Sequence, residues 1–265
     1  MNKKILAVLA AVVFSGLLAG NNSVLAKNNK DVDVPEVDGV YDVAGRPDLK
    51  VRVIVHKAKP APVPDPVAMC VADGASEAVV DAAGWKLPAS WTYSLNAASV
   101  PLSVGGGNLS EIAANAFAAW SVNVPLVSIV PGLPTFVARA AFDGKNIIAW
   151  GTASSSALAI TYIWYNTASG IVSELDTIIN KKYVWKWADQ DILPSCGIGR
   201  VSAFSGAYDA QSILTHELGH WYGLNDHYTS DFANNTMYGY GFKGDAKYDT
   251  LTNGDIAGLK IIYGN

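Results

Sequence analysis

Three of the four histidines in this 265-residue chain stand within the stretch HELGHWYGLNDH, from His216 to His227. On an α-helix, His216 and His220 project from the same face because they are four positions apart. Gly223 is suited to end such a helix, because glycine adopts the left-handed C-cap conformation at little cost. The stretch therefore predicts a helix followed by a sharp turn that brings residues 224–227 back towards the two imidazoles.

The histidine spacing suits a single metal ion. Two imidazole nitrogens on one helix face can meet a zinc ion at about 2.0–2.1 Å each. Glu217, next to the first histidine, can reach a water on that ion as a general base, which is the logic of the HExxH pattern. Asp226 and His227 both lie in the returning turn as candidates for the third ligand. Neighbouring residues in an extended turn point apart, so we expect one of them, not both.

The same residues resemble those of a known family. HELGHWYGLND is similar to the metzincin pattern HExxHxxGxx(H/D), in which the third ligand follows the second histidine by six residues. That position is Asp226, and small secreted snapalysin-type enzymes also carry aspartate there, followed by His-Tyr as in Asp226-His227-Tyr228. The residues NTMYG around Met237 look like the Met-turn, whose methionine lies beneath the zinc site.

The resemblance covers about residues 85–265 and points to the matrixin branch. The ending TLTNGDIAGLKIIYG is similar to the matrixin C-terminal helix, and ALAITYIWYN with IVSELDTIINKKYVW look like the matrixin edge strand and its neighbour. The resemblance implies a zinc endopeptidase with Glu217 as catalytic base and His216, His220 and Asp226 as metal ligands. It also implies that the edge strand, at about residues 157–164, holds an extended protein or peptide substrate.

The patterns predict an α/β (α+β) domain with a twisted mixed sheet, an active-site helix and a C-terminal helix. Apolar residues in residues 109–120 recur at helical spacing. Asp209 is the candidate N-cap of a second helix, and Asn253 or Thr252 is the candidate N-cap of the last one. Strand-like stretches, rich in β-branched and aromatic residues or alternating in polarity, occupy residues 49–56, 91–95, 147–150, 158–165 and 171–179.

Residues 1–26 read as a signal peptide. Lys3 and Lys4 precede an apolar run that is short for a membrane span, and Val24-Leu25-Ala26 suits cleavage after Ala26. We therefore expect a secreted, extracellular protein with no stable membrane anchor after cleavage.

Residues 27–84 are predicted to be an N-terminal pro-segment or appendage. They include a linker with prolines at 60, 62, 64 and 66. In an oxidising compartment Cys70 and Cys196 most simply form a disulfide. The alternative, a thiol that blocks the zinc as in matrixin pro-segments, is disfavoured because AMCVADG lacks the pattern PRCGxPD.

Composition limits the partners. Half of the residues are hydrophobic, 16% are charged and the formal net charge is −4, without basic blocks, so nucleic acid is not expected. We expect a monomer. Structural calcium is a further candidate cofactor at Asp245, Asp249 and Asp255, although solvated turns are the favoured interpretation of these residues. The competing functional hypothesis is a non-catalytic zinc-containing surface or adhesion module on the same scaffold, which would be expected to have lost Glu217.

Overall fold

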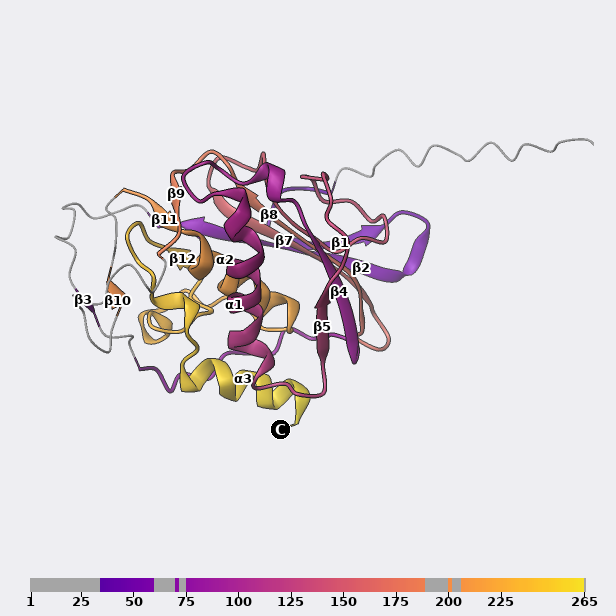
Figure 1. Ribbon diagram of the computed structural model, residues 1–265. Helices are drawn as coiled ribbons and strands as arrows, with labels where there is room; N and C mark the ends of the chain where they lie inside the picture. The colour runs from indigo at the N-terminus through magenta and orange to yellow at the C-terminus, as the bar shows by residue number, and fades with distance from the viewer. Residues whose placement is uncertain (1–33, 60–69, 72–74, 189–199, 202–205, 265) are drawn as a thin grey trace, which may run out of the picture. The chain divides into compact units, whose positions relative to one another are not determined.

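Eight strands form a mixed sheet in the computed structural model, which describes residues 34–59, 70–71, 75–188, 200–201 and 206–264 (Figure 1). The order is β1-β2-β7-β8-β6-β4-β5, and β12 pairs with β2. Strands β5, β4, β6 and β8 run parallel, whereas β8–β7, β7–β2 and β2–β1 are antiparallel pairs. The strands are β1 (Gly39–Val43), β2 (Arg46–Ala58), β4 (Ser90–Leu95), β5 (Ser128–Pro131), β6 (Ile147–Gly151), β7 (Ala157–Asn166), β8 (Val172–Asn180) and β12 (Tyr240–Gly241).

In the described ranges three α-helices accompany the sheet: α1 (Leu109–Ser121), α2 (Ala210–Trp221) and α3 (Asn253–Tyr263). The α/β (α+β) class with a mixed sheet is thus confirmed. Short 3₁₀ helices lie at Ala97–Ser99, Gly106–Asn108, Ser230–Phe232 and Lys247–Asp249. Two small two-stranded sheets pair β3 (Cys70–Val71) with β10 (Arg200–Val201), and β9 (Trp185–Lys186) with β11 (Tyr208–Asp209).

Helix ends follow local side-chain chemistry. The Asp209 side chain accepts a hydrogen bond from the backbone N–H of Ser212 at the start of α2. Thr252 and Asp255 form a reciprocal capping box at the start of α3, and Gly264 ends that helix in the left-handed conformation. The predicted cap at Asp209 is confirmed, and of the two candidates for the last helix it is Thr252, not Asn253, that caps α3.

The core has two parts, one on each face of the sheet. Helix α2 packs against α1 and against β7, and the larger cluster includes Leu218 and Trp221 of α2 (Figure 1). The smaller cluster contains alternate residues of β2, among them Val51 and Val53, together with Tyr162 of β7. Because side chains alternate along a strand, the even-numbered residues of β2 face α2.

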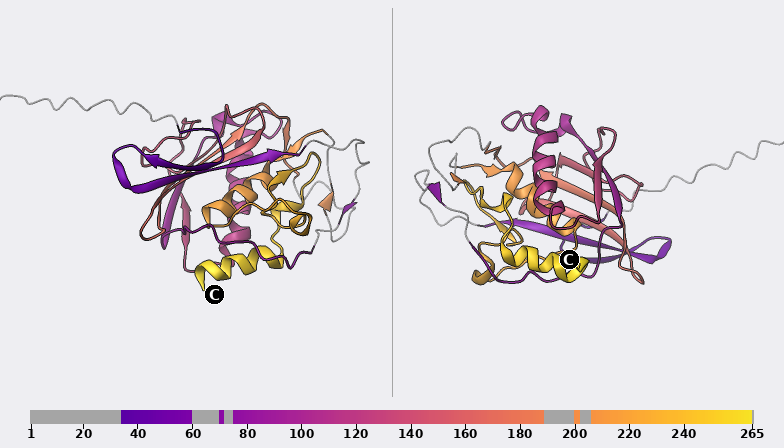
Figure 2. Two further views of the ribbon diagram at one scale, coloured as in Figure 1. Left: turned by 180° about the vertical axis from the view of Figure 1, so that it is seen from behind. Right: turned by 60° about the horizontal axis from the view of Figure 1, so that its bottom comes forward.

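The N-terminal segment is part of this sheet. Residues assigned from sequence to a pro-segment or appendage form β1 and β2, and β2 runs alongside β7 over most of its length (Figure 2, left). The expectation that residues 157–164 form an edge strand is therefore wrong. Strand β7 is flanked by β2 on one side and β8 on the other. The local pattern of residues 49–56 predicts a strand but does not tell which sheet edge that strand joins.

Candidate metal centre

Helix α2 carries His216, Glu217 and His220, and all three side chains are buried. The helix ends at Trp221, and Gly223 follows with a φ of 100°. A Cβ atom on Gly223 would also lie 2.3 Å from the carbonyl oxygen of Trp85. Glycine is thus required both by the backbone conformation and by the close approach of another segment.

The turn after α2 brings Asp226 to the two imidazoles. Oδ1 of Asp226 lies 3.0 Å from Nε2 of His216 and 3.3 Å from Nε2 of His220. Two ligands of one tetrahedral zinc ion, each at about 2.0–2.1 Å from the metal, lie about 3.3 Å apart. These three atoms are buried and have no hydrogen-bond partner among the described residues. Because unpaired buried polar atoms are costly, this donor set fits a cation, and the group can hold a metal ion.

The opposite ring nitrogens fix the two imidazoles. Nδ1 of His216 lies 2.7 Å from the carbonyl oxygen of Thr236, and Nδ1 of His220 lies 2.8 Å from that of Leu224. A carbonyl oxygen only accepts, so each Nδ1 carries the proton, and in a neutral ring Nε2 keeps a lone pair. Outer hydrogen bonds of this kind orient histidine ligands in metal sites.

His227, the alternative third ligand, lies outside this group. Its Nε2 accepts a hydrogen bond from the backbone N–H of Asp81, and its ring stacks on Phe232. Its backbone pairs with Tyr238. The structure thus brings Asp226, and not its neighbour, to the two histidines.

Met237 is fully buried, and its sulfur lies against Gly219 of α2. A Cβ atom on Gly219, inside the HELGH stretch, would lie 2.1 Å from Sδ of Met237, so the two fit only because position 219 is glycine. Asp255 of α3 holds this turn. Its carboxylate accepts hydrogen bonds from the backbone N–H groups of Thr236 and Met237 and from Thr252.

Both carboxylate oxygens of Glu217 have partners in the protein. Oε1 lies 3.0 Å from Nδ1 of His56, and Oε2 accepts a hydrogen bond of 2.6 Å from the hydroxyl of Thr161 on β7. Thr161 is itself bonded to Thr177 on β8. The Trp221 indole donates to Thr177, so the chain of donors runs from Trp221 through Thr177 and Thr161 to Glu217.

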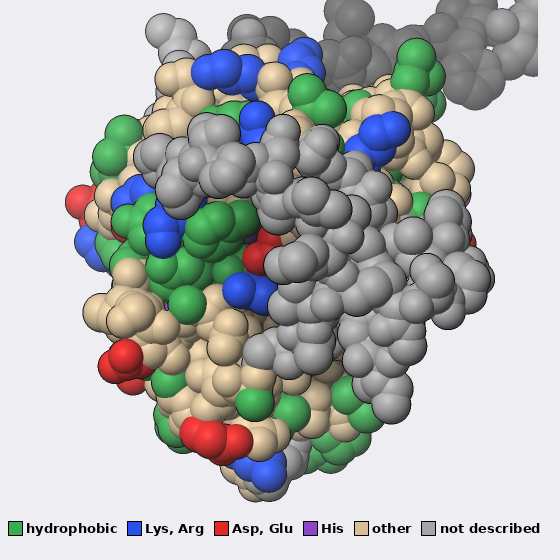
Figure 3. Space-filling model, turned by 90° about the vertical axis from the view of Figure 1, so that its left-hand side faces the viewer, with side chains coloured by type: hydrophobic (Ala, Val, Ile, Leu, Met, Phe, Trp, Pro, Cys, Tyr) green, Lys and Arg blue, Asp and Glu red, His purple; other side chains and the backbone are tan. Residues whose placement is uncertain are grey.

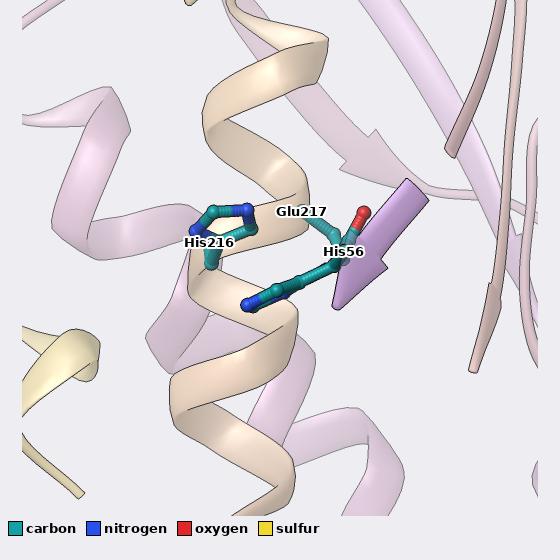
Figure 4. A group of neighbouring side chains, drawn as sticks. All are labelled: His56, His216 and Glu217. Carbon is teal, nitrogen blue, oxygen red and sulfur yellow. The ribbon is translucent and has the colours of Figure 1, made fainter. Parts of the chain in front are cut away.

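His56 comes from β2, and its ring lies beside that of His216 (Figure 4). The ring centroids are 3.8 Å apart, and Nε2 of His56 is buried without a hydrogen-bond partner among the described residues. His56, His216 and Glu217 form a second group of three that can hold a metal ion. His56 was not predicted as part of the site. It ends the alternating stretch LKVRVIVH, and a histidine on the buried face of such a strand, where an apolar residue is expected, is the signal that could have found it.

Burial sets the ionisation of the centre. Burial and the neighbouring His216 lower the pKa of His56, so this ring is neutral and donates from Nδ1 to Glu217. Burial alone would raise the pKa of Glu217, but the hydrogen bond from His56 and the neighbouring His216 and His220 outweigh it and lower that pKa. Burial opposes the charge on Asp226 as well, yet His220 and His216 hold its pKa well below the ordinary value.

Most of this centre is shielded from solvent, and the Asp226 side chain is 7% exposed. Glu217, His56 and His220 are each 0% exposed. A surface cavity of about 660 Å³ lies elsewhere, lined by residues such as Glu111 and Trp187 and by no member of either group. The side of the molecule that carries β12 shows hydrophobic side chains next to Lys or Arg side chains (Figure 3).

The calcium candidates have other surroundings. Asp255 is fully buried and bonded to the Met237 turn, so its interpretation as a solvated turn is wrong. Asp249 is also buried, whereas Asp245 accepts a hydrogen bond from the backbone N–H of Lys247. Within the described ranges, neither group of potential metal ligands includes any of the three.

Two sequence predictions, the signal peptide and the disulfide, involve residues that the structure does not describe. The signal peptide and Cys196 lie wholly outside the described residues, so the disulfide stays a prediction. The backbone of Cys70 pairs with Val201, five residues after Cys196. In the described part of the chain, no helix has both the length and the apolar character needed to cross a bilayer.

Comparison with models of known protein families gave no match, and comparison with curated proteins gave none either.

Proposed function

We propose that this chain is a secreted zinc-dependent endopeptidase of the metzincin type. The observation that carries the proposal is the meeting of three buried, unpaired ligand atoms, from His216, His220 and Asp226, beside a carboxylate on the same helix. Two neutral imidazoles and one carboxylate are a common ligand set of catalytic zinc sites, which keep a further position for water.

The bound zinc would act as a Lewis acid that makes water acidic near neutral pH and stabilises negative charge on a peptide carbonyl oxygen. Glu217 would accept the proton of the attacking water and later deliver it to the leaving amine. Thr161 holds one oxygen of that carboxylate by a hydrogen bond and so fixes its orientation. The competing hypothesis of a non-catalytic adhesion module gives no role to Glu217.

The test is mass-spectrometric profiling of a peptide library after long incubation with the zinc-loaded chain. We expect slow cleavage that a chelator abolishes and that Glu217→Gln reduces by at least about 100-fold, as loss of a general base does. The variant should still bind one zinc ion per chain, because its ligands are unchanged. Cleavage that persists in Glu217→Gln, or a chain that binds no zinc, would refute the proposal.

A further inference from the structure

Strand β2 lies directly against Glu217, in the place where a substrate would have to bind. A general base needs a carboxylate oxygen that can reach the water whose proton it accepts. In this structure one oxygen of Glu217 is bonded to His56 and the other to Thr161, and the group is 0% exposed. The His56 ring also covers that of His216 at 3.8 Å (Figure 4).

Strand β2 fills the space between two backbones that would otherwise be free to pair. On one side it pairs antiparallel with β7 from Leu49 to Lys57. On the other side the N–H groups of Lys57 and Lys59 donate to the carbonyl oxygens of Gly239 and Gly241. An extended peptide that added to β7 would need this same position.

We infer that β2 is an internal inhibitor of the proposed peptidase, and that His56 is the residue that blocks Glu217. This inference rests on the proposed function and adds the regulation of its site. Cleavage at full rate requires β2 to leave its place beside β7. While β2 is covalently attached, its high effective concentration keeps it bound.

Two features favour inhibition over a positioning role for His56. A positioning residue would orient the carboxylate from outside the place that a substrate strand takes beside β7, as Thr161 does, since it lies on β7 itself. His56 instead comes from the strand that occupies the edge of β7 opposite β8, and both His56 and Glu217 are 0% exposed. Its segment is also held by the buried side chains of Val51, Val53 and Ile54.

The experiment compares full-length chains with zinc bound. In His56→Ala the contacts with Glu217 and His216 that help to hold β2 over the centre are lost, and in Val53→Asp a charge on the opposite face loosens β2 without altering a residue of the centre. The matched controls are Leu109→Ala, a buried truncation in α1, and Val40→Asp, the same change at a position 54% exposed. Thermal unfolding confirms that each variant is folded.

Two quantities are measured, the rate of cleavage of a fluorogenic peptide and the rate of zinc release to a chelator. We expect both rates to rise at least about tenfold in His56→Ala and in Val53→Asp, because the open state of the parent chain is a minor one. Both controls should stay within about twofold of the parent chain. Adding Glu217→Gln to His56→Ala should abolish the gain in cleavage and leave the faster zinc release.

The outcomes separate the two proposals. Equal rates in the parent chain and His56→Ala, with cleavage that still depends on Glu217, would overturn inhibition by β2 and leave the peptidase intact. A slower rate in His56→Ala would also overturn it and make His56 a positioning residue. Absence of zinc binding, or of cleavage dependent on Glu217 in every variant, would refute the peptidase itself.

Discussion

At the scale of single residues, two neighbours in the chain have different surroundings. The Asp226 side chain is 7% exposed and faces both histidine Nε2 atoms. His227 points away and accepts a hydrogen bond from the backbone of Asp81. This divergence follows from extended backbone, in which successive side chains point to opposite sides.

Asp226→Asn should weaken zinc binding by at least about 100-fold, because loss of an outer hydrogen-bond partner alone costs about 10–100-fold. The asparagine keeps the size of the side chain but removes the negative charge beside the metal. His227→Ala is the matched control and should change zinc affinity by less than about threefold. Competition against a fluorescent zinc chelator measures both. A larger effect from His227→Ala than from Asp226→Asn would exclude Asp226 as the ligand.

The residue pattern alone left open whether Asp226 or His227 is the third ligand. The spacing of His216 and His220 predicts one face of one helix, and the structure brings both Nε2 atoms to the same oxygen of Asp226. The roles of His56, Thr161 and Asp255 were not predictable, because each reaches the centre through strand pairing or a turn far away in sequence. A single histidine in an alternating strand carries no local signal of its partner.

At the scale of elements, the Met237 turn depends on α3. Asp255 caps α3 through Thr252 and also accepts hydrogen bonds from the backbone of Thr236 and Met237. The carbonyl oxygen of Thr236 in turn accepts a hydrogen bond from His216. One buried carboxylate therefore links the start of a helix to the orientation of a metal ligand.

Asp255→Ala should lower the free energy of unfolding by about 3–5 kcal/mol, because it leaves several buried N–H groups without an acceptor. Zinc affinity should fall as well, since the support of His216 is lost. Asp245→Ala is the control, because it removes a partly exposed carboxylate with one backbone hydrogen bond and should cost less than about 1 kcal/mol. Denaturant titration measures the free energy of unfolding of both variants. An equal loss of that free energy in the two would contradict the role assigned to Asp255.

Most elements near the centre were predictable because their periodicity is strong. Helices α1, α2 and α3 and strands β4, β6, β7 and β8 lie where the patterns place them, to within about two residues. The position of β7 inside the sheet was not predictable. Its neighbour β2 precedes it by about 100 residues, and pairing between distant strands leaves no trace in local composition.

At the scale of the whole chain, the centre joins segments that are far apart in sequence. β2 supplies His56, and β7 supplies Thr161. Helix α2 and the turn after it supply the candidate metal ligands, and the Met237 turn supports them. Zinc binding by such a site is coupled to the fold, because the ligands converge only in the folded state.

The most direct measurement is zinc K-edge X-ray absorption on the full-length chain with one equivalent of zinc. We predict nitrogen and oxygen ligands only, at about 2.0–2.1 Å, with the scattering pattern of two imidazoles. His220→Ala should remove one imidazole from that pattern. A sulfur ligand at about 2.3 Å, or a spectrum that His220→Ala leaves unchanged, would contradict a centre built from His216, His220 and Asp226.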